Sequence, residues 1–309
     1  MKKYPIKKEF FPWNLFAPPI SEKFLALAVP HMKPPKFLWR DAELDVSTYQ
    51  IPCSDGDSIT CFVLSPKELS AKSPCLIYLH GGGFVLEAAG YHYRNAIRYA
   101  KELGCKVVFP LYRLAPQHPH PIFFEDCYST LCWTFDHAEQ LQIDTERIGI
   151  GGDSAGSTLA VGVCMMARDR KHPVRFAFQM LLYPFLDARN NSESCKKFTD
   201  TPMWNSSLSS RITPMTKADQ SRPDYVYYSP VEADSFAGLP PAYIETAEFD
   251  CLHDDGILYA ELLRNVGIEV VLNETKGTMH GYDIVQSSPV TKASLEARIR
   301  FMKEQYNGR

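Results

Sequence analysis

The sequence predicts an α/β protein in which one open, mostly parallel sheet carries helices on both faces. Six short apolar segments, each bounded by turn residues, are the candidate strands. Helical segments separate them, and such alternation is typical of parallel strands joined by crossovers. The candidate strands are apolar on both faces, as expected of strands buried between two helical layers.

The expected elements follow one another in a simple order. The segments LDVSTYQIP at 44–52 and SITCFVLSP at 58–66 flank the turn CSDGD and predict an antiparallel strand pair. The six buried strands are predicted at 75–80, 105–110, 147–152, 176–184, 241–249 and 269–276. Helices are predicted at 91–103, 123–141, 155–169 and 251–267. A chain of 309 residues with 45% hydrophobic composition is long enough to bury such a core.

Two segments depart from this alternation. Residues 1–40 are rich in Phe, Trp and Pro, and SEKFLALAVPHM within them predicts a short amphipathic helix. Residues 188–226 form a polar connection, and connections of this length inside a compact domain are usually functional lids or disordered. We therefore expect an N-terminal cap segment at 1–40 and a main domain at 41–309 that carries a cap insert at about 188–226.

The composition argues against several classes of protein. A net charge of −3, a pI near 6.3 and the lack of basic clusters interleaved with aromatics indicate that nucleic acid is not a partner. The nine cysteines are scattered without a Cys-x-x-Cys pair, which predicts reduced thiols and a cytoplasmic protein. Pro18 and Pro19 break the apolar stretch after the basic N-terminus, so neither a signal peptide nor a membrane anchor is expected. A homodimer is compatible with these features.

Residues 152–156 read GDSAG and place Ser154 where the strand at 147–152 must turn into the helix at 155–169. A tight strand-to-helix turn forces strained backbone angles and close packing, so only small side chains fit around it. The turn raises Ser154 above the carboxyl edge of the sheet, where the new helix directs free N–H groups toward whatever the serine attacks. Taken alone, the motif is also compatible with an ordinary Gly/Ser turn.

A second motif, HGGGF at 80–84, follows the strand at 75–80. Acyl transfer places negative charge on the former carbonyl oxygen, and backbone N–H groups must meet that charge at close range. Glycines let the backbone approach a ligand, so Gly82, Gly83 and Ala155 are the candidate donors of an oxyanion hole. A phosphate-binding loop and a plain hinge are the alternatives, but neither common glycine-rich phosphate motif fits these letters.

A serine hydroxyl needs a base, and the base needs an orienting acid. His280 in GTMHGYD follows the last predicted strand and reaches the same sheet edge as Ser154. Asp250 stands directly at the end of the strand at 241–249, whereas Asp254 and Asp255 fall in the first turn of the next helix, where acids favour the helix dipole. The order Ser154, Asp250, His280 is the order expected for an α/β-hydrolase triad.

These motifs together resemble the hormone-sensitive-lipase-like family of α/β-hydrolase esterases over most of the chain. The matching segments are HGGGF at 80–84, YRLAPQHPHP at 112–121, FEDCY at 124–128, GDSAG at 152–156, LLYPFLD at 181–187, DCLHDDG at 250–256 and HGY at 280–282. Two departures are visible. Gln117 stands where the family usually has Glu, and Cys-Leu-His at 251–253 stands where Pro-Leu-Arg is frequent.

The resemblance implies an α/β-hydrolase fold with a cap made of the N-terminal segment and the insert. It implies the same roles for the residues already singled out: nucleophile Ser154, acid Asp250, base His280, and oxyanion donors Gly82, Gly83 and Ala155. Gln117 carries no charge, so the resemblance implies no ion pair at this position, and neither departure touches the expected chemistry.

We therefore expect a serine carboxylesterase that cleaves short- to medium-chain esters through an acyl-enzyme, without cofactor or metal. An amidase or formamidase would use the same triad, and sequence alone does not separate it from an esterase. A non-catalytic hormone receptor of this fold typically loses a triad member, whereas all three positions are filled here. His118 and His120 lack a third metal ligand at suitable spacing, so no metal is expected.

Other polar residues of the motifs are expected to have structural roles. Arg113 and Asp126 should hold structural hydrogen bonds or an ion pair near the site, His80 should shape the glycine loop, and Asp153 should serve the turn. Bulky cap residues are expected to fold over the serine and close an apolar acyl pocket that favours dissolved, small-molecule esters. These cap residues are Phe11, Trp13, Phe16, Phe24 and Trp204.

Overall fold

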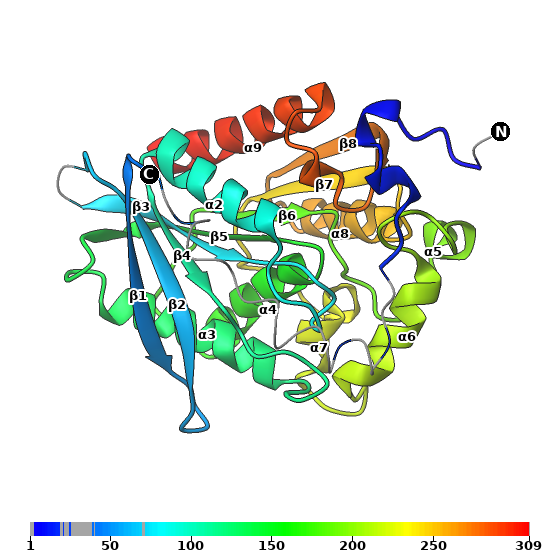
Figure 1. Ribbon diagram of the computed structural model, residues 1–309. Helices are drawn as coiled ribbons and strands as arrows, with labels where there is room; N and C mark the ends of the chain where they lie inside the picture. Colours follow the sequence, from blue (N-terminus) through cyan, green and yellow to red (C-terminus); the bar gives the residue numbers. More distant parts are fainter. Residues whose placement is uncertain are drawn as a thin grey trace.

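The computed structural model describes residues 3–18, 21, 25, 39, 41–69 and 72–308. In this part of the chain the sheet has eight strands in the spatial order β1-β2-β4-β3-β5-β6-β7-β8 (Figure 1). The strands are β1 (Leu44–Pro52), β2 (Ser58–Pro66), β3 (Ser73–Leu79), β4 (Lys106–Pro110), β5 (Ile143–Asp153), β6 (Gln179–Leu182), β7 (Ala242–Phe249) and β8 (Val270–Met279).

Strand β2 pairs antiparallel with both β1 and β4, whereas β4, β3, β5, β6, β7 and β8 are mutually parallel. The predicted fold, a mostly parallel sheet preceded by an antiparallel strand pair, is therefore confirmed. Parallel strands end at the same edge of a sheet. Strands β3, β5, β7 and β8 thus deliver the four segments that begin at His80, Ser154, Asp250 and His280 to one edge.

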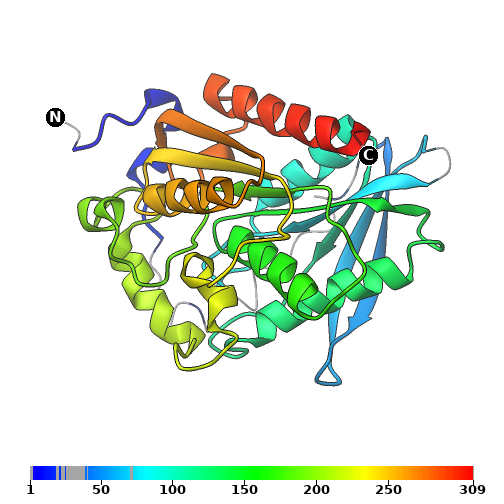
Figure 2. The same ribbon diagram turned by 180° about the vertical axis from the view of Figure 1, so that it is seen from behind.

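Helices cover both faces of the sheet, and the strands alternate between two cores (Figures 1 and 2). In β3, Cys75, Ile77 and Leu79 join one core while Leu76 and Tyr78 join the other. The first core lies under α3 (Ile122–Asp136), α4 (Ala155–Asp169) and α8 (His253–Asn265). The second lies under α2 (Gly90–Leu103) and α9 (Pro289–Asn307). Burial on both faces explains why the strands are apolar throughout.

Several observed boundaries differ from the expected ones: β5 begins at Ile143 instead of 147, and β6 begins at Gln179 instead of 176. Three further differences are larger or have a local cause. Strand β6 ends at Leu182, earlier than predicted, because Tyr183 takes a left-handed φ of 36° that turns the chain out of the sheet. Helix α3 ends at Asp136, because the following residues must turn back to enter β5. Helix α9 was not predicted, although Ser288 caps its start and Pro289 occupies its first position.

The connection between β6 and β7 contains three short α-helices, α5 (Glu193–Lys197), α6 (Ser206–Thr216) and α7 (Tyr225–Tyr228), and the 3₁₀ helix η5 (Pro230–Glu232). They occupy nearly the same stretch as the insert expected at 188–226. Asn205 caps α6 by accepting a hydrogen bond from the Leu208 N–H at 3.0 Å. Helix α7 packs against α4, which attaches the insert to the sheet's helical layer.

The N-terminal segment, residues 3–18, runs across the end of β8 and along the insert (Figure 1, dark blue). The Lys7 N–H donates to the Gly277 carbonyl at 2.9 Å, and the Met203 N–H donates to the Phe16 carbonyl at 2.6 Å. The segment therefore bridges β8 and the insert. The helix predicted within SEKFLALAVPHM lies almost wholly outside the described residues.

All nine cysteines fall within the described ranges, and each thiol is free. Among the helices of the described residues, none is both long enough and apolar enough to cross a bilayer.

Helix α4 lies against β3 with no room for a side chain between them. A Cβ atom at Gly156 would stand 2.1 Å from the Leu79 carbonyl oxygen. We expect Gly156→Ala to lower the free energy of unfolding by about 3 kcal/mol, because backbone is not free to move aside. Gly90→Ala is the control, since its Cβ would meet only Arg94 Nη1 at 3.5 Å. Urea unfolding of both variants checks this, and equal stabilities would contradict it.

Candidate active site

Ser154 stands between β5 and α4 in a strained backbone conformation, with φ 55° and ψ −122°. The Ser154 N–H donates to the Leu182 carbonyl at 2.8 Å, which ties the turn to β6. A Cβ at Gly152 would lie 2.4 Å from the Gly156 carbonyl carbon, so the glycines flanking the serine are required by space. The turn thus holds Ser154 at the carboxyl edge of the sheet, at the start of a helix.

The structure brings Ser154, His280 and Asp250 into one hydrogen-bonded chain. His280 Nε2 lies 2.9 Å from Ser154 Oγ, and His280 Nδ1 lies 2.7 Å from Asp250 Oδ2. Asp250 is completely buried, and its other oxygen accepts the Leu252 N–H at 3.0 Å. Gly281 takes a φ of 64°, which lets the chain turn immediately after His280.

The other two acids considered from sequence face different partners. Asp254 accepts the Ser194 N–H at 2.8 Å. Asp255 Oδ2 accepts the N–H groups of Leu186 and Asp187, each at 3.1 Å, and burial raises the pKa of Asp255 well above its usual range. Both carboxyls therefore fasten the chain after β6 to the start of α8, and Asp250 is the acid that meets His280.

The glycine loop after β3 approaches the serine with its backbone. Gly82 and Gly83 have φ values of 122° and 61°, which side chains rarely adopt. A Cβ at Gly83 would lie 2.6 Å from Trp204 Cη2, so a side chain there would strike the insert. Among the described backbone groups, the N–H groups of Gly82 and Gly83 donate to no carbonyl. These two donors and the first N–H of α4, at Ala155, remain available to a ligand.

His80 shapes this loop from beneath, as its sequence context suggests. Its Nδ1 lies 2.7 Å from the Gly81 carbonyl, and its ring stacks on Tyr112 at a centroid distance of 4.3 Å. Burial lowers the pKa of His80 to about 3, so the ring is neutral and its Nδ1–H donates. His80 therefore holds the loop without taking a charge.

Asp153, next to the serine, does more than serve the turn. It is fully buried, and its carboxylate accepts hydrogen bonds from Tyr78 at 3.0 Å, Tyr91 at 3.2 Å and His92 Nε2 at 2.7 Å. Burial raises the pKa of Asp153, but the attraction of His92 and the hydrogen bonds from His92 and Tyr78 outweigh burial and lower it. Asp153 thus anchors α2 beneath the glycine loop.

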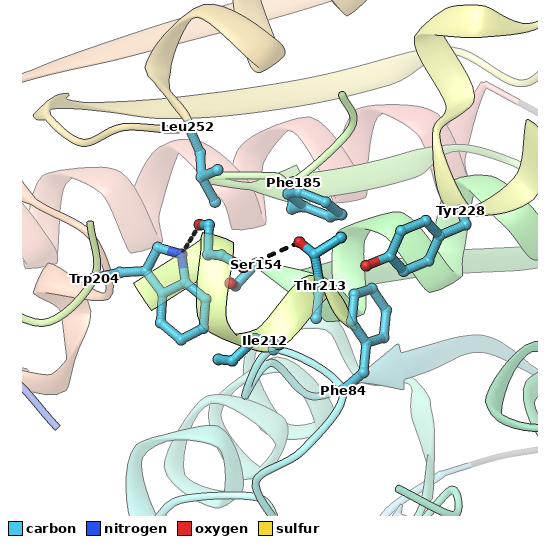
Figure 3. A pocket seen from close by; sticks show the side chains of 11 residues that line it. Phe84, Ser154, Phe185, Trp204, Ile212, Thr213, Tyr228 and Leu252 are labelled. Carbon is cyan, nitrogen blue, oxygen red and sulfur yellow. Dashed lines mark hydrogen bonds between the residues drawn. The ribbon is translucent and has the colours of Figure 1, made fainter. Parts of the chain in front are cut away.

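The pocket beside Ser154 is a partly open cleft, and the space within it that no atom fills is about 300 Å³, which includes open solvent. Trp204 lies on one side of the serine in Figure 3, and Tyr228 and Phe84 lie on the other. The Trp204 indole N–H donates to Ser209 Oγ at 2.9 Å, which fixes the indole ring beside Ser154. The lining residues are Gly83, Phe84, Ser154, Ala155, Phe185, Trp204, Ser209, Ile212, Thr213, Tyr228 and Leu252. Trp204 was expected here, and the LLYPFLD motif contained the signal for Phe185.

The expectation that N-terminal aromatics close the pocket is wrong for Phe11, Trp13 and Phe16, none of which lines it. Phe11 is 66% exposed and Phe16 is 43% exposed. The segment instead turns Phe10 inward, where its ring meets Tyr282 edge-on at 5.9 Å. Trp13 packs on Phe16 at 5.8 Å and does not line the pocket. Phe24 lies outside the described residues.

Arg113 and Asp126 form the expected ion pair, with Nη2 and Oδ1 2.6 Å apart. Arg113 also binds Asp55 and Asp57, each at 2.8 Å, so the pair secures the turn between β1 and β2. His120 is buried among Phe123, Phe124 and Tyr228, where it acts as a core ring. Across the described ranges, no three His, Cys, Asp or Glu side chains gather as metal ligands.

Comparison with known proteins agrees with this geometry. A family model described as the α/β hydrolase fold matches residues 76–284. The chain belongs to the α/β hydrolase fold family. Esterase LipI of Mycobacterium tuberculosis is 35% identical over 232 residues, which are 74% of this chain and 71% of that protein. The expected membership in this esterase family is confirmed.

Solved structures of esterases share the fold across nearly the whole chain. A bacterial heroin esterase is 30% identical with a TM-score of 0.79, covering 92% of this chain and 90% of its own. A thermostable esterase from Pseudomonas putida is 27% identical with a TM-score of 0.81, covering 92% of this chain and 88% of its own. The predicted class of enzyme, a carboxylic ester hydrolase, is confirmed by these relatives.

The buried neutral ring of His80 makes stability depend on pH. Its pKa of about 3 lies below that of an unfolded histidine, so between these values the unfolded chain binds the extra proton and stability falls as the pH falls. We expect the protonation of this histidine in the unfolded chain to lower the free energy of unfolding by about 3 kcal/mol between pH 7 and pH 4.5. Urea unfolding at the two pH values should show a smaller loss for His80→Asn than for the wild type. An identical loss in both proteins would contradict the assignment.

Proposed function

We propose that this protein hydrolyses carboxylic esters of small, dissolved substrates with Ser154 as nucleophile, His280 as base and Asp250 as orienting acid. The observation that supports this most directly is the hydrogen-bonded chain from Asp250 through His280 to Ser154, at the mouth of an apolar pocket. The N–H groups of Gly82, Gly83 and Ala155 are the proposed oxyanion donors. No metal or cofactor takes part in the proposed reaction.

The first half of the reaction transfers the acyl group to the serine. Ser154 Oγ attacks the ester carbonyl carbon while its proton passes to His280 Nε2. The carbonyl oxygen becomes an oxyanion that the three N–H groups stabilise. The bond to the alcohol oxygen then breaks, and His280 Nε2 returns the proton to that oxygen. Asp250 accepts the Nδ1–H of His280 throughout and stabilises the imidazolium.

The second half releases the acid. Water attacks the acyl carbon on Ser154 and gives its proton to His280 Nε2. The tetrahedral intermediate collapses by breaking its bond to Ser154 Oγ, which takes the proton back. The carboxylic acid leaves, and the free enzyme is restored.

We propose that the N-terminal segment and the insert together form a cap on the domain at 41–309. Trp204, Ile212 and Thr213 of the insert line the pocket, which supports a role in substrate binding. The N-terminal segment supports the insert from outside, since Lys3 and Tyr4 both bind Asp200. The free thiols support a reducing, cytoplasmic location.

An amide hydrolase would use the same groups, and the two activities are separated by comparing an ester with an anilide of the same acyl group. A faster anilide would assign amide hydrolysis. Labelling by a fluorophosphonate separates an enzyme from a binding protein of this fold, because only an activated serine is labelled.

Ser154→Ala should fold normally and lose at least about 10⁴-fold in kcat, because nucleophile and base act as one unit. Hydrolysis of p-nitrophenyl butyrate and fluorophosphonate labelling are the two measurements. Ser210→Ala is the control, since this exposed serine on α6 does not line the pocket. Retention of more than about a tenth of the activity would refute the nucleophile assignment.

The acyl preference should follow from the pocket's far wall. Phe84, Phe185 and Tyr228 pack against one another. The ring centroids are 6.2 Å apart for Phe84–Phe185, 5.4 Å for Phe84–Tyr228 and 5.6 Å for Phe185–Tyr228, which supports a wall that limits the length of the acyl chain. Each accommodated CH₂ contributes about 0.8 kcal/mol until the wall is reached. We expect kcat/KM for p-nitrophenyl esters to peak at about two to six acyl carbons and to fall beyond roughly ten. A maximum at about twelve carbons, or activation at an oil interface, would overturn this.

A further inference from the structure

A buried ionic cluster lies behind His280, between the sheet and α9. Glu245 of β7, Arg298 of α9 and Asp283 are each fully buried. Arg298 Nη1 donates to Asp283 Oδ2 at 2.9 Å, and Arg298 Nη2 donates to Glu245 Oε1. Burial opposes the charge on Arg298, but Glu245, Tyr99 and Asp283 outweigh it and raise the pKa of the guanidinium well above its usual range. A buried arginine paired in this way holds its partners in fixed positions.

This cluster fixes the segment that carries the base. Asp283 lies in the turn Tyr282–Ile284, directly after the loop that begins at His280. Its carboxyl accepts Asn95 Nδ2 of α2 at 3.2 Å in addition to Arg298. The Tyr282 hydroxyl lies 2.6 Å from Glu245 Oε1. Side chains of α2, α9 and β7 therefore hold the residues that follow His280 by hydrogen bonds.

Tyr183 connects the cluster to the imidazole itself. Its hydroxyl donates to Asp283 Oδ1 at 2.7 Å, and its N–H donates to the Glu245 carbonyl at 2.6 Å. Its ring meets the ring of His280 edge-on, with centroids 4.9 Å apart and planes at 65°. The residue adopts a strained φ of 36°, a conformation that persists only where the surroundings enforce it. Tyr183 is thus held at both ends against the base.

The two hydrogen bonds of the triad leave one rotation of the His280 ring unconstrained. Asp250 holds Nδ1 and Ser154 lies at Nε2, so the ring could still swing about the line joining these two contacts. Tyr183 stands on one side of the ring, and Trp204 stands at a centroid distance of 5.8 Å. The indole is held by the insert, whereas Tyr183 is held by the sheet and the ionic cluster.

We propose that Tyr183, anchored by Asp283 and Arg298, is a positioning residue that keeps the His280 imidazole aligned for proton transfer with Ser154. This inference rests on the proposed function. Removing the Tyr183 hydroxyl frees the ring from Asp283 and lets the imidazole lose its alignment. Proton transfer suffers, while the pocket and its walls are unchanged.

The test compares two buried tyrosines that each donate a hydrogen bond to a carboxyl of the ionic cluster. Tyr183→Phe removes the bond to Asp283, and Tyr243→Phe removes an equivalent bond, from Tyr243 to Glu245 at 2.9 Å, away from His280. The kcat is normalised to active sites titrated with a fluorophosphonate. We expect Tyr183→Phe to lower kcat about 10-fold with KM within about twofold of the wild type, and Tyr243→Phe to keep kcat within about twofold.

Equal loss of kcat in both variants, or full kcat in Tyr183→Phe, would overturn the positioning role. If Tyr183→Phe does not fold, Asp283→Asn replaces it. In this variant the amide oxygen still accepts the hydrogen bond from the Tyr183 hydroxyl, but the attraction of residue 283 to Arg298 is weaker. A loss of kcat of about threefold supports the positioning role, and an unchanged kcat refutes it. Failure of the proposed function is distinguishable, because it would show as activity retained in Ser154→Ala.

Discussion

The contact between the backbone of α4 and the ends of β3 and β5 is the constraint on which the site depends. Gly152 and Gly156 bring this helix so close to the Leu79 carbonyl that no side chain fits between them. That approach forces Ser154 into its strained conformation and sets the first N–H of α4 beside the glycine loop. The proposed nucleophile and oxyanion donors therefore share one rigid support, and only the proposed base and its acid come from elsewhere.

The proposed base, His280, and its acid, Asp250, are held by burial and charge instead of steric closeness. Asp250 and His280 follow two adjacent parallel strands, so the sheet sets their separation. Asp153 on one side and Glu245 with Asp283 on the other place buried carboxyls behind the site, each satisfied by several donors. Such groups are tolerated only when paired, and their partners come from α2 and α9, so both helices become part of the catalytic scaffold.

Much of this architecture was predictable because it depends on short, local sequence patterns. Apolar segments gave the strands, and GDSAG, HGGGF and the residues after the last strands gave the positions that converge at one edge. The acid could be chosen only because Asp250 stands at the strand end, and the bonds of Asp254 and Asp255 needed the folded chain. Trp204 was expected at the pocket, but its far wall and the ionic cluster were not predicted, since Tyr228, Arg298 and Asp283 meet their partners only through tertiary packing.

The missing side chain at Gly83 has a consequence for how such a site diversifies. Trp204 occupies the space that a Cβ there would fill, so an aromatic ring from the insert rests directly on bare backbone. The insert thereby supplies one wall of the pocket and also shields polar backbone from water. Substitutions in the insert can therefore change which substrates fit the pocket, while the residues at the edge of the sheet stay the same. The same substitutions change how readily the product leaves the pocket, so substrate selectivity and product release change together.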